Sequence, residues 1–122
     1  MKLFDAELKI MEALWQEGEV TAKRLAEIMK ERTGWSKTTT YTMVKRCIEK
    51  GACGRSEPNF VCRPLVSARE VREYETNELI NRMYGGAADR LVACLLEGKT
   101  LSPEETERLK KLVRDLSETG SK

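Results

Sequence analysis

Residues 34–51 constrain the fold of this chain most, because they are typical of one short helix with two chemically different faces. Ser36 can cap the first turn by accepting a backbone N–H, and Gly51 suits the left-handed stop that often follows a last helical residue. The pattern predicts a helix over about residues 37–50. At 100° per residue, one side of this helix is expected to face a core through Thr40, Val44, Cys47 and Ile48.

The opposite side of the predicted helix carries hydroxyls and cations and almost no acid. Short hydroxyl side chains let a helix approach duplex DNA closely and can bond phosphates or base edges, while Lys and Arg neutralise phosphates or bind guanine. Two interpretations stay open, a DNA-reading helix and a solvated helix on which threonines happen to cluster. In the first, the groove residues would be Ser36, Lys37, Thr38, Thr39, Tyr41 and Thr42. Lys45 and Arg46 would lie nearer the phosphates.

Two further helices are expected before this one. Residues 5–16 carry apolar side chains at helical spacing, and a second helix is expected after Thr21, whose hydroxyl suits an N-cap. Only a tight turn at Thr33 and Gly34 then separates the second helix from the third. A short turn between two packed helices is the helix-turn-helix pattern.

The pattern changes after the third helix. Residues 52–56 and 59–63 are short runs separated by turn-forming residues around Pro58, which predicts a small β-hairpin. Three helices followed by a hairpin make a winged helix. Arg55 and Arg63, one on each run, either contact phosphates beside the groove or are simply solvated on an edge hairpin.

The remaining chain predicts three more helices, over about residues 68–84, 88–97 and from Pro103 onward. Their apolar stripes are too sparse to enclose a core of their own. The expected fold class is therefore mainly α, with a winged-helix DNA-binding domain at 1–66 and a helical dimerisation domain at 67–122. The alternative is that these helices fold back on the winged helix of the same chain. The dimer interface would use Leu79, Ile80, Met83, Leu91, Val92, Leu95, Leu109, Leu112, Val113 and Leu116.

Enzyme chemistry has little support in the sequence. The chain has no histidine, which removes most general-base, triad and zinc schemes, and its four cysteines form no Cys-x-x-Cys pair. We therefore expect no enzyme, no cofactor and no metal site. Cys47, Cys53, Cys62 and Cys94 are typical of small buried hydrophobes. A second interpretation pairs Cys53 with Cys62 across the hairpin, as a redox-responsive or soft-metal site.

The net charge of +2 is too small to indicate nucleic acid by itself, but it is unevenly distributed. Residues 1–66 contain 12 Lys and Arg against 9 Asp and Glu, whereas residues 67–122 contain 10 against 11. The weak net charge leaves a second functional class open, a winged helix used as a protein-interaction or scaffold module. No apolar run is long enough to span a bilayer, and the first residues lack the pattern of a signal peptide, so we expect a cytoplasmic protein without membrane insertion.

Short motifs spread over the chain resemble those of one known family. They are Asp5-Ala6-Glu7, Leu14-Trp15, residues 34–39, Thr42, Lys45-Arg46, Lys50-Gly51, residues 64–67, Gly85-Gly86, Leu91-Val92 and Leu101-Ser102. Their order and spacing, from Leu3 to about Leu116, are similar to those of the penicillinase and methicillin-resistance repressors, the BlaI/MecI family of antibiotic-resistance regulators. The resemblance implies an N-terminal winged helix, a C-terminal helical dimerisation region, and binding to inverted-repeat operators in double-stranded DNA that silences the genes beside them.

The resemblance also implies a partner and a mode of inactivation. In the best-known members a membrane sensor with a metalloprotease domain responds to β-lactam and leads to cleavage in the dimerisation region. By alignment the cleaved bond would fall between Cys94 and Leu95, although the Asn-Phe pair of those members is absent here. Phe4 stands where the family often has a hydroxyl cap, which leaves Asp5 as the expected cap. Copper-responsive relatives carry Cys-x-Cys pairs near the C-terminus that residues 116–122 lack, so copper sensing is not expected.

Overall fold

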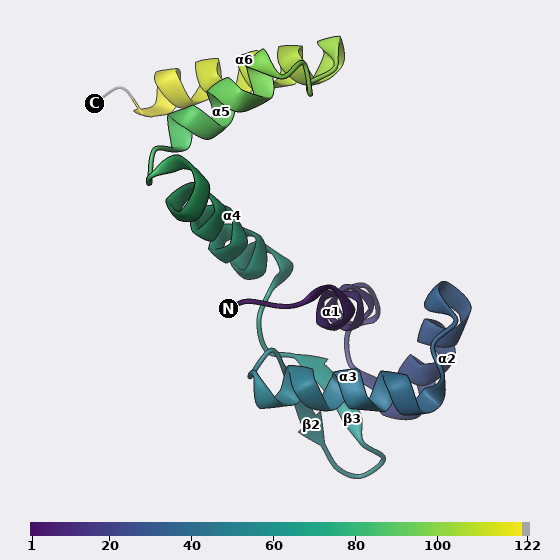
Figure 1. The fold of residues 1–122 in the computed structure, drawn as a ribbon. Helices are drawn as coiled ribbons and strands as arrows, with labels where there is room; N and C mark the ends of the chain where they lie inside the picture. The colour runs from purple at the N-terminus through teal and green to yellow at the C-terminus, as the bar shows by residue number, and fades with distance from the viewer. Residues whose placement is uncertain (121–122) are drawn as a thin grey trace. The chain divides into compact units, whose positions relative to one another are not determined.

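Three helices pack on one another at the start of the chain. α1 spans Asp5–Glu17, α2 spans Ala22–Thr33 and α3 spans Lys37–Glu49, and both α1 and α2 pack against α3 (Figure 1). This computed structural model describes residues 1–120, with side chains described through residue 118. α2 and α3 are joined by a tight turn and form the predicted helix-turn-helix.

The ends of α2 and α3 follow from local side-chain chemistry. Thr21 Oγ1 accepts the N–H of Arg24 at 3.1 Å, and Ser36 Oγ accepts the N–H of Thr39 at 3.1 Å. Gly34 closes α2 in the left-handed conformation, with a φ of 76° that glycine adopts without a Cβ clash. The caps predicted at Thr21 and Ser36 are confirmed.

The start of α1 differs from the sequence expectation. The prediction that Asp5 caps this helix is wrong, because Asp5 is the first helical residue and Phe4 occupies the N-cap position. A phenyl ring has no acceptor for a backbone N–H. The Glu7 side chain instead turns back and accepts the Phe4 N–H at 2.8 Å, which satisfies one amide at this end of the helix.

The predicted hairpin is present, and it forms a sheet with a third strand. β2 spans Cys53–Ser56 and β3 spans Val61–Pro64, and β3 is the middle strand of an antiparallel sheet of order β1-β3-β2. β1 is the pair Val20–Thr21, which directly precedes α2 and which the sequence does not indicate as a strand. Pairing with β3, which places Val20 opposite Cys62, holds this segment extended. No local pattern indicates such a contact, because it joins segments far apart in the chain.

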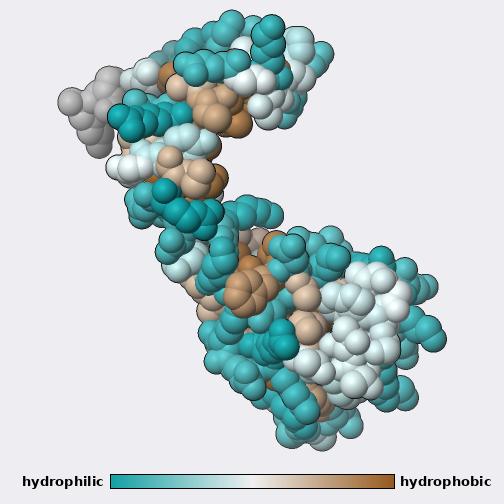
Figure 2. Space-filling view, viewed as in Figure 1, coloured by the Kyte–Doolittle hydropathy of each residue, from teal (hydrophilic) through white to brown (hydrophobic). Residues whose placement is uncertain are grey.

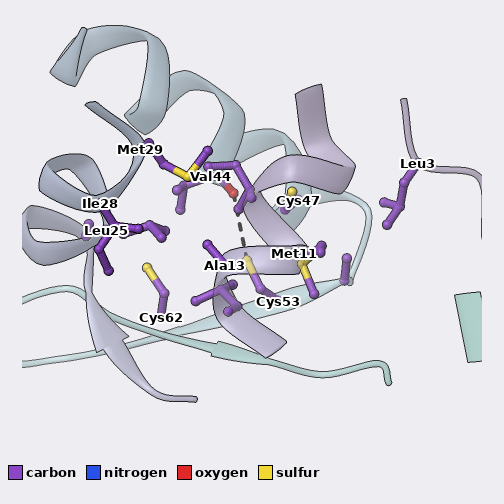
Figure 3. Close-up of a cluster of buried hydrophobic side chains, with 14 of the residues drawn as sticks. Leu3, Met11, Ala13, Leu25, Ile28, Met29, Val44, Cys47, Cys53 and Cys62 are labelled. Carbon is purple, nitrogen blue, oxygen red and sulfur yellow. Dashed lines mark hydrogen bonds between the residues drawn. The ribbon is translucent and has the colours of Figure 1, made fainter. Parts of the chain in front are cut away.

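The core of the winged helix lies between α1, α2, α3 and the sheet. Fully buried side chains from all of these elements meet there, with three cysteines among leucine, methionine and valine side chains (Figure 3). Val71, from α4 at Ala68–Tyr84, is also buried in this cluster. Trp15 Nε1 donates to the Val66 carbonyl oxygen at 2.9 Å. These contacts attach the first turns of α4 to the winged helix.

Two more helices follow α4, as predicted. α5 spans Ala88–Glu97 and α6 spans Pro103–Gly120. α4 and α6 both begin with a reciprocal capping box, in which Ser67 or Ser102 accepts the N–H of a glutamate and that glutamate's carboxylate accepts the serine N–H. The sequence signals for both helix starts are therefore confirmed.

The contacts within the chain divide it into two units. They are Met1–Asn77 and Glu78–Lys122, so the division falls inside α4. The boundary expected after residue 66 separates a DNA-binding part from a dimerisation part, and this functional division stays a prediction. Within the part of the chain that the structure describes, no helix is long and apolar enough to cross a membrane.

Candidate nucleic-acid interface

The outward face of α3 is open to solvent, while its inward face lies in the core. The inward side chains of Val44 and Cys47 are fully buried, as their helical spacing predicts. Of the residues expected to contact DNA from this helix, Thr39 and Tyr41 are half-buried. The exposed ones are Ser36, Lys37, Thr38, Thr42, Lys45 and Arg46. No acid interrupts this surface of hydroxyls and cations before Glu49.

Hydrogen bonds near the start of α3 determine what its hydroxyls can offer a ligand. Thr42 Oγ1 donates to the Thr38 carbonyl oxygen at 3.0 Å, so its hydroxyl proton is already used. Ser36 Oγ donates to Thr39 Oγ1 at 3.0 Å while accepting the Thr39 N–H. Since a hydroxyl oxygen keeps its lone pairs, Thr42 presents an acceptor and a methyl group. An acceptor suits the amino group of adenine or cytosine, and a methyl group suits thymine.

The hairpin of β2 and β3 is the wing of the winged helix, and its two arginines lie on opposite faces. The register pairs Arg55 with Cys62 and Arg63 with Gly54, and adjacent residues of a strand point to opposite faces. Because Cys62 is buried, Arg55 lies on the face toward the core and Arg63 lies on the other. Arg63 Nη1 donates to Ser56 Oγ at 2.8 Å. The structure thus brings one of the two arginines toward α3 and not the other.

Arg55 is held by two residues at the tip of the hairpin. Its Nε lies 2.6 Å from Glu57 Oε1, and its guanidinium carbon lies 3.6 Å from the centroid of the Phe60 ring. The Phe60 ring centroid in turn lies 5.8 Å from that of Tyr41, with the rings tilted by 52°. Lys37 Nζ lies 5.6 Å from the Tyr41 centroid. These contacts join the wing to the first half of α3.

Glu57 and Phe60 are absent from the residues that the sequence pattern assigns to the interface. Glu57 Oε2 accepts the Phe60 N–H at 3.1 Å. The hydrogen bond from Arg55 and this backbone hydrogen bond hold the pKa of Glu57 below its ordinary value. The turn-forming residues around Pro58 indicate a loop, but they carry no signal for a contact between Phe60 and Tyr41.

The three cysteines of the winged helix are buried and free. Cys47 Sγ lies 3.6 Å from the Glu7 carbonyl oxygen. Cys53 Sγ lies 3.9 Å from the Val44 carbonyl oxygen (Figure 3). The register does not place Cys53 opposite Cys62, so the direct cross-strand pair considered from the sequence is not formed. Burial raises the pKa of Cys62 to about 11. A buried, protonated thiol reacts slowly, so Cys62 behaves as a small hydrophobe. A hydrogen bond with Cys47 lowers the pKa of Cys53, but the Cys53 side chain is fully buried in the core.

Clusters of metal ligands are also absent from the described part of the chain. Across residues 1–120, no group of three or more Cys, Asp or Glu side chains gathers where it could hold a metal ion. The surface of hydroxyls and cations on α3 is the candidate site in the winged helix.

The helices of the second unit leave most of their apolar surface uncovered. Among residues 78–118, whose side chains are described, none is buried. Figure 2 shows hydrophobic surface over α5 and α6. Of the expected dimer residues, the exposed ones are Leu79, Met83, Val92, Leu112, Val113 and Leu116. The half-buried ones are Ile80, Leu91, Leu95 and Leu109. Several exposed large apolar side chains on neighbouring helices often mark a protein–protein contact.

Cys94 and Leu95, which flank the bond aligned with the family's cleavage position, lie inside α5. The Cys94 carbonyl oxygen accepts the Gly98 N–H at 3.0 Å, and a hydrogen bond with the Cys94 thiol raises the pKa of Tyr84. A protease that binds its substrate as an extended strand therefore needs α5 to unwind locally before it can reach this bond.

Comparison with known proteins finds matches along most of the chain. The family model described as penicillinase repressor matches residues 3–115. The chain is 28% identical to the penicillinase repressor of Bacillus licheniformis over 116 residues, which cover 93% of this chain and 91% of that protein. It is 26% identical to the methicillin resistance regulatory protein MecI of Staphylococcus aureus (strain N315) over 114 residues, which cover 92% of this chain and 93% of that protein.

Two solved structures are similar to part of the chain. The DNA binding domain of the repressor BlaI matches with a TM-score of 0.52 at 28% identity, covering 55% of this chain and 84% of that one. The monomeric form of Bacillus licheniformis BlaI in complex with the blaP half-operator matches with a TM-score of 0.50 at 26% identity, covering 57% and 88%. The winged helix-turn-helix fold and the family match over residues 3–115 agree, and the chain belongs to the penicillinase-repressor family.

Proposed function

We propose that this chain is a transcriptional repressor that binds operator DNA as a homodimer, with α3 in the major groove. The observation that carries the proposal is the exposed surface of hydroxyls and cations on α3, which no acid interrupts before Glu49. α3 is the second helix of the helix-turn-helix, and this helix usually contacts base edges in the major groove. The complex of a related repressor with a half-operator supports the same use of the fold here.

The proposed contacts divide between base edges and phosphates. Thr38 and Thr42 are exposed in the first half of α3, which usually meets base edges. Lys45 and Arg46 are exposed about a turn further along, where a cation suits the DNA backbone. The remaining proposed contacts are Ser36, Lys37, Thr39 and Tyr41 at the groove and Arg55 and Arg63 near phosphates.

Residues 67–122 are proposed to hold two copies together, and residues 1–66 to bind the DNA. The exposed apolar residues of α5 and α6 support this division, because a second copy would cover them. A two-fold dimer presents two α3 helices to two inverted half-sites. Each bound helix then raises the effective concentration of the other at its half-site.

The proposed repressor acts in the cytoplasm, without catalysis, cofactor or metal. Release from DNA is assigned to a membrane sensor with a metalloprotease domain, by analogy with the family. The bond between Cys94 and Leu95 is the proposed cleavage position, and its place inside α5 makes local unwinding part of that step. The raised pKa of Cys62 and the burial of the other winged-helix thiols speak against a redox signal.

The salt dependence of DNA binding tests this proposal. The full chain is titrated with duplexes from the DNA beside its own gene, and neutralising several phosphates should cost roughly 10³-fold or more in affinity between about 50 and 200 mM salt. If no such duplex is bound even at the lowest salt, DNA binding is refuted. The winged helix would then serve as a protein-interaction module, which the net charge of only +2 also permits.

A further inference from the structure

We propose that Arg55, Phe60 and Tyr41 act as one contact unit, in which Glu57 and Phe60 hold the Arg55 guanidinium ready for a DNA phosphate beside the groove that receives α3. This inference rests on the proposed DNA-binding function. It assigns positioning roles to Glu57 and Phe60, and it makes the wing and α3 dock as one body.

The contacts of Arg55 leave its outer edge for a ligand. A guanidinium carries five N–H donors in a planar fork. Glu57 takes Nε at 2.6 Å, and the Phe60 ring supports the flat face at 3.6 Å, so the two Nη groups remain for a phosphate. The Arg55 side chain is 46% exposed, which gives a ligand access. Because two neighbours already orient it, Arg55 loses less side-chain entropy on binding than a solvated arginine does.

Phe60 is itself held firmly enough to serve as the support. Its φ of 50° lies in the left-handed region, which is uncommon for a bulky residue. Glu57 Oε2 accepts its N–H at 3.1 Å, and its carbonyl oxygen accepts the Ala22 N–H at 2.9 Å. Its ring packs against Tyr41 of α3. A costly backbone conformation maintained by contacts to α2, α3 and the wing is of the kind that clusters at functional sites.

Arg63 provides a matched comparison within the same hairpin. It has the same charge, but the register places it on the face opposite Arg55. Its contact is with Ser56, within the wing, rather than with a ring that packs on α3. The inference therefore predicts coupling of Arg55, and not of Arg63, to Phe60.

Salt titrations of the full chain on a generic duplex test the positioning roles. Log affinity falls as log salt rises, and Arg55→Gln should make this slope shallower by about 0.9 for each phosphate that it leaves without a cation. Phe60→Asn removes no charge, yet it should make the slope shallower by the same amount. Asparagine is chosen because it tolerates the left-handed backbone conformation. Phe60→Tyr keeps the ring and should restore the original slope.

The double variants decide whether Phe60 acts through Arg55. Adding Phe60→Asn to Arg55→Gln should make the slope no shallower than Arg55→Gln alone does. In combination with Arg63→Gln, the changes in slope caused by the two substitutions should add in full. Thermal unfolding followed by circular dichroism identifies a temperature at which every variant is folded, and the titrations are compared at that temperature. An unchanged slope in Phe60→Asn, or additivity with Arg55→Gln, overturns the inference while the steep slope of the intact chain upholds the proposed function. Absence of salt-dependent binding by the intact chain overturns both.

Discussion

Lys50 Nζ donates to Glu7 Oε1 at 2.6 Å and so joins the end of α3 to the first turn of α1. The Glu7 side chain is 2% exposed and that of Lys50 is 29% exposed. Lys50 Nζ also donates to the Lys2 carbonyl oxygen at 2.9 Å and lies 4.2 Å from the centroid of the Phe4 ring. One charged group therefore fixes the N-terminal segment and the C-terminal end of α3 to each other.

Removing the Lys50 ammonium should destabilise the winged helix. Among the described residues, Lys50→Met leaves the buried Glu7 carboxylate with only the Phe4 N–H as a hydrogen-bond donor, which should lower the free energy of unfolding by about 3 kcal/mol. Lys45→Met makes the same change on the exposed side of α3 and should alter that free energy by less than about 0.5 kcal/mol. Urea unfolding followed by tryptophan fluorescence measures both. Equal losses in the two variants would contradict the prediction.

The same carboxylate should make the fold sensitive to acid. Burial raises the pKa of Glu7, but the hydrogen bonds from Lys50 and from the Phe4 N–H outweigh burial and place the pKa below its ordinary value of 4.5. A carboxylate with a lowered folded pKa stabilises the fold above its unfolded pKa, and this stabilisation is lost as pH falls through the folded pKa. The difference in unfolding free energy between the original chain and Glu7→Gln should therefore shrink below pH 4.5. A constant difference down to the acid transition would exclude this role.

Much of the helical framework could be predicted because it depends on local chemistry. A cap such as Ser36 acts within one turn, and the burial of Val44 follows from helical spacing alone. The rest depends on which distant segments meet. β1 is extended because it pairs with β3, and the side to which Arg55 points is set by the hairpin register. The left-handed Phe60 and the contact between Glu7 and Lys50 likewise leave no periodic signal in the sequence.

Thr40 offers a way to raise stability without touching the outward face of α3. Its side chain is fully buried, and among the described residues its hydroxyl oxygen is buried without a hydrogen-bond partner. Thr40→Val replaces that hydroxyl by a methyl group of similar size and should raise the free energy of unfolding by about 1 kcal/mol. Thr38→Val, at an exposed position, serves as the control and should change it little. A decrease in stability in Thr40→Val would indicate that the hydroxyl has a partner in solution.

Base reading and phosphate binding should separate along α3. Thr42→Val keeps the methyl group but removes the hydroxyl acceptor, so it should reduce discrimination between operator and random duplex at a cost of about 1 to 3 kcal/mol. Lys45→Ala should weaken binding to both duplexes alike and flatten the salt dependence. Fluorescence anisotropy with both duplexes gives the two affinities. If Thr42→Val lowers the two affinities by the same factor, Thr42 does not read bases.

Selection of duplexes from a random-sequence library by the full chain tests most directly the claim that two copies read DNA through α3. The enriched sequences should share an inverted repeat, with half-site centres separated by about 10 base pairs or a multiple of that spacing. Leu112→Glu, at a position that is 60% exposed on α6, should prevent pairing of the copies and keep only a weak preference for one half-site. Enrichment of no sequence, or of a single unrepeated site by the intact chain, would contradict the account.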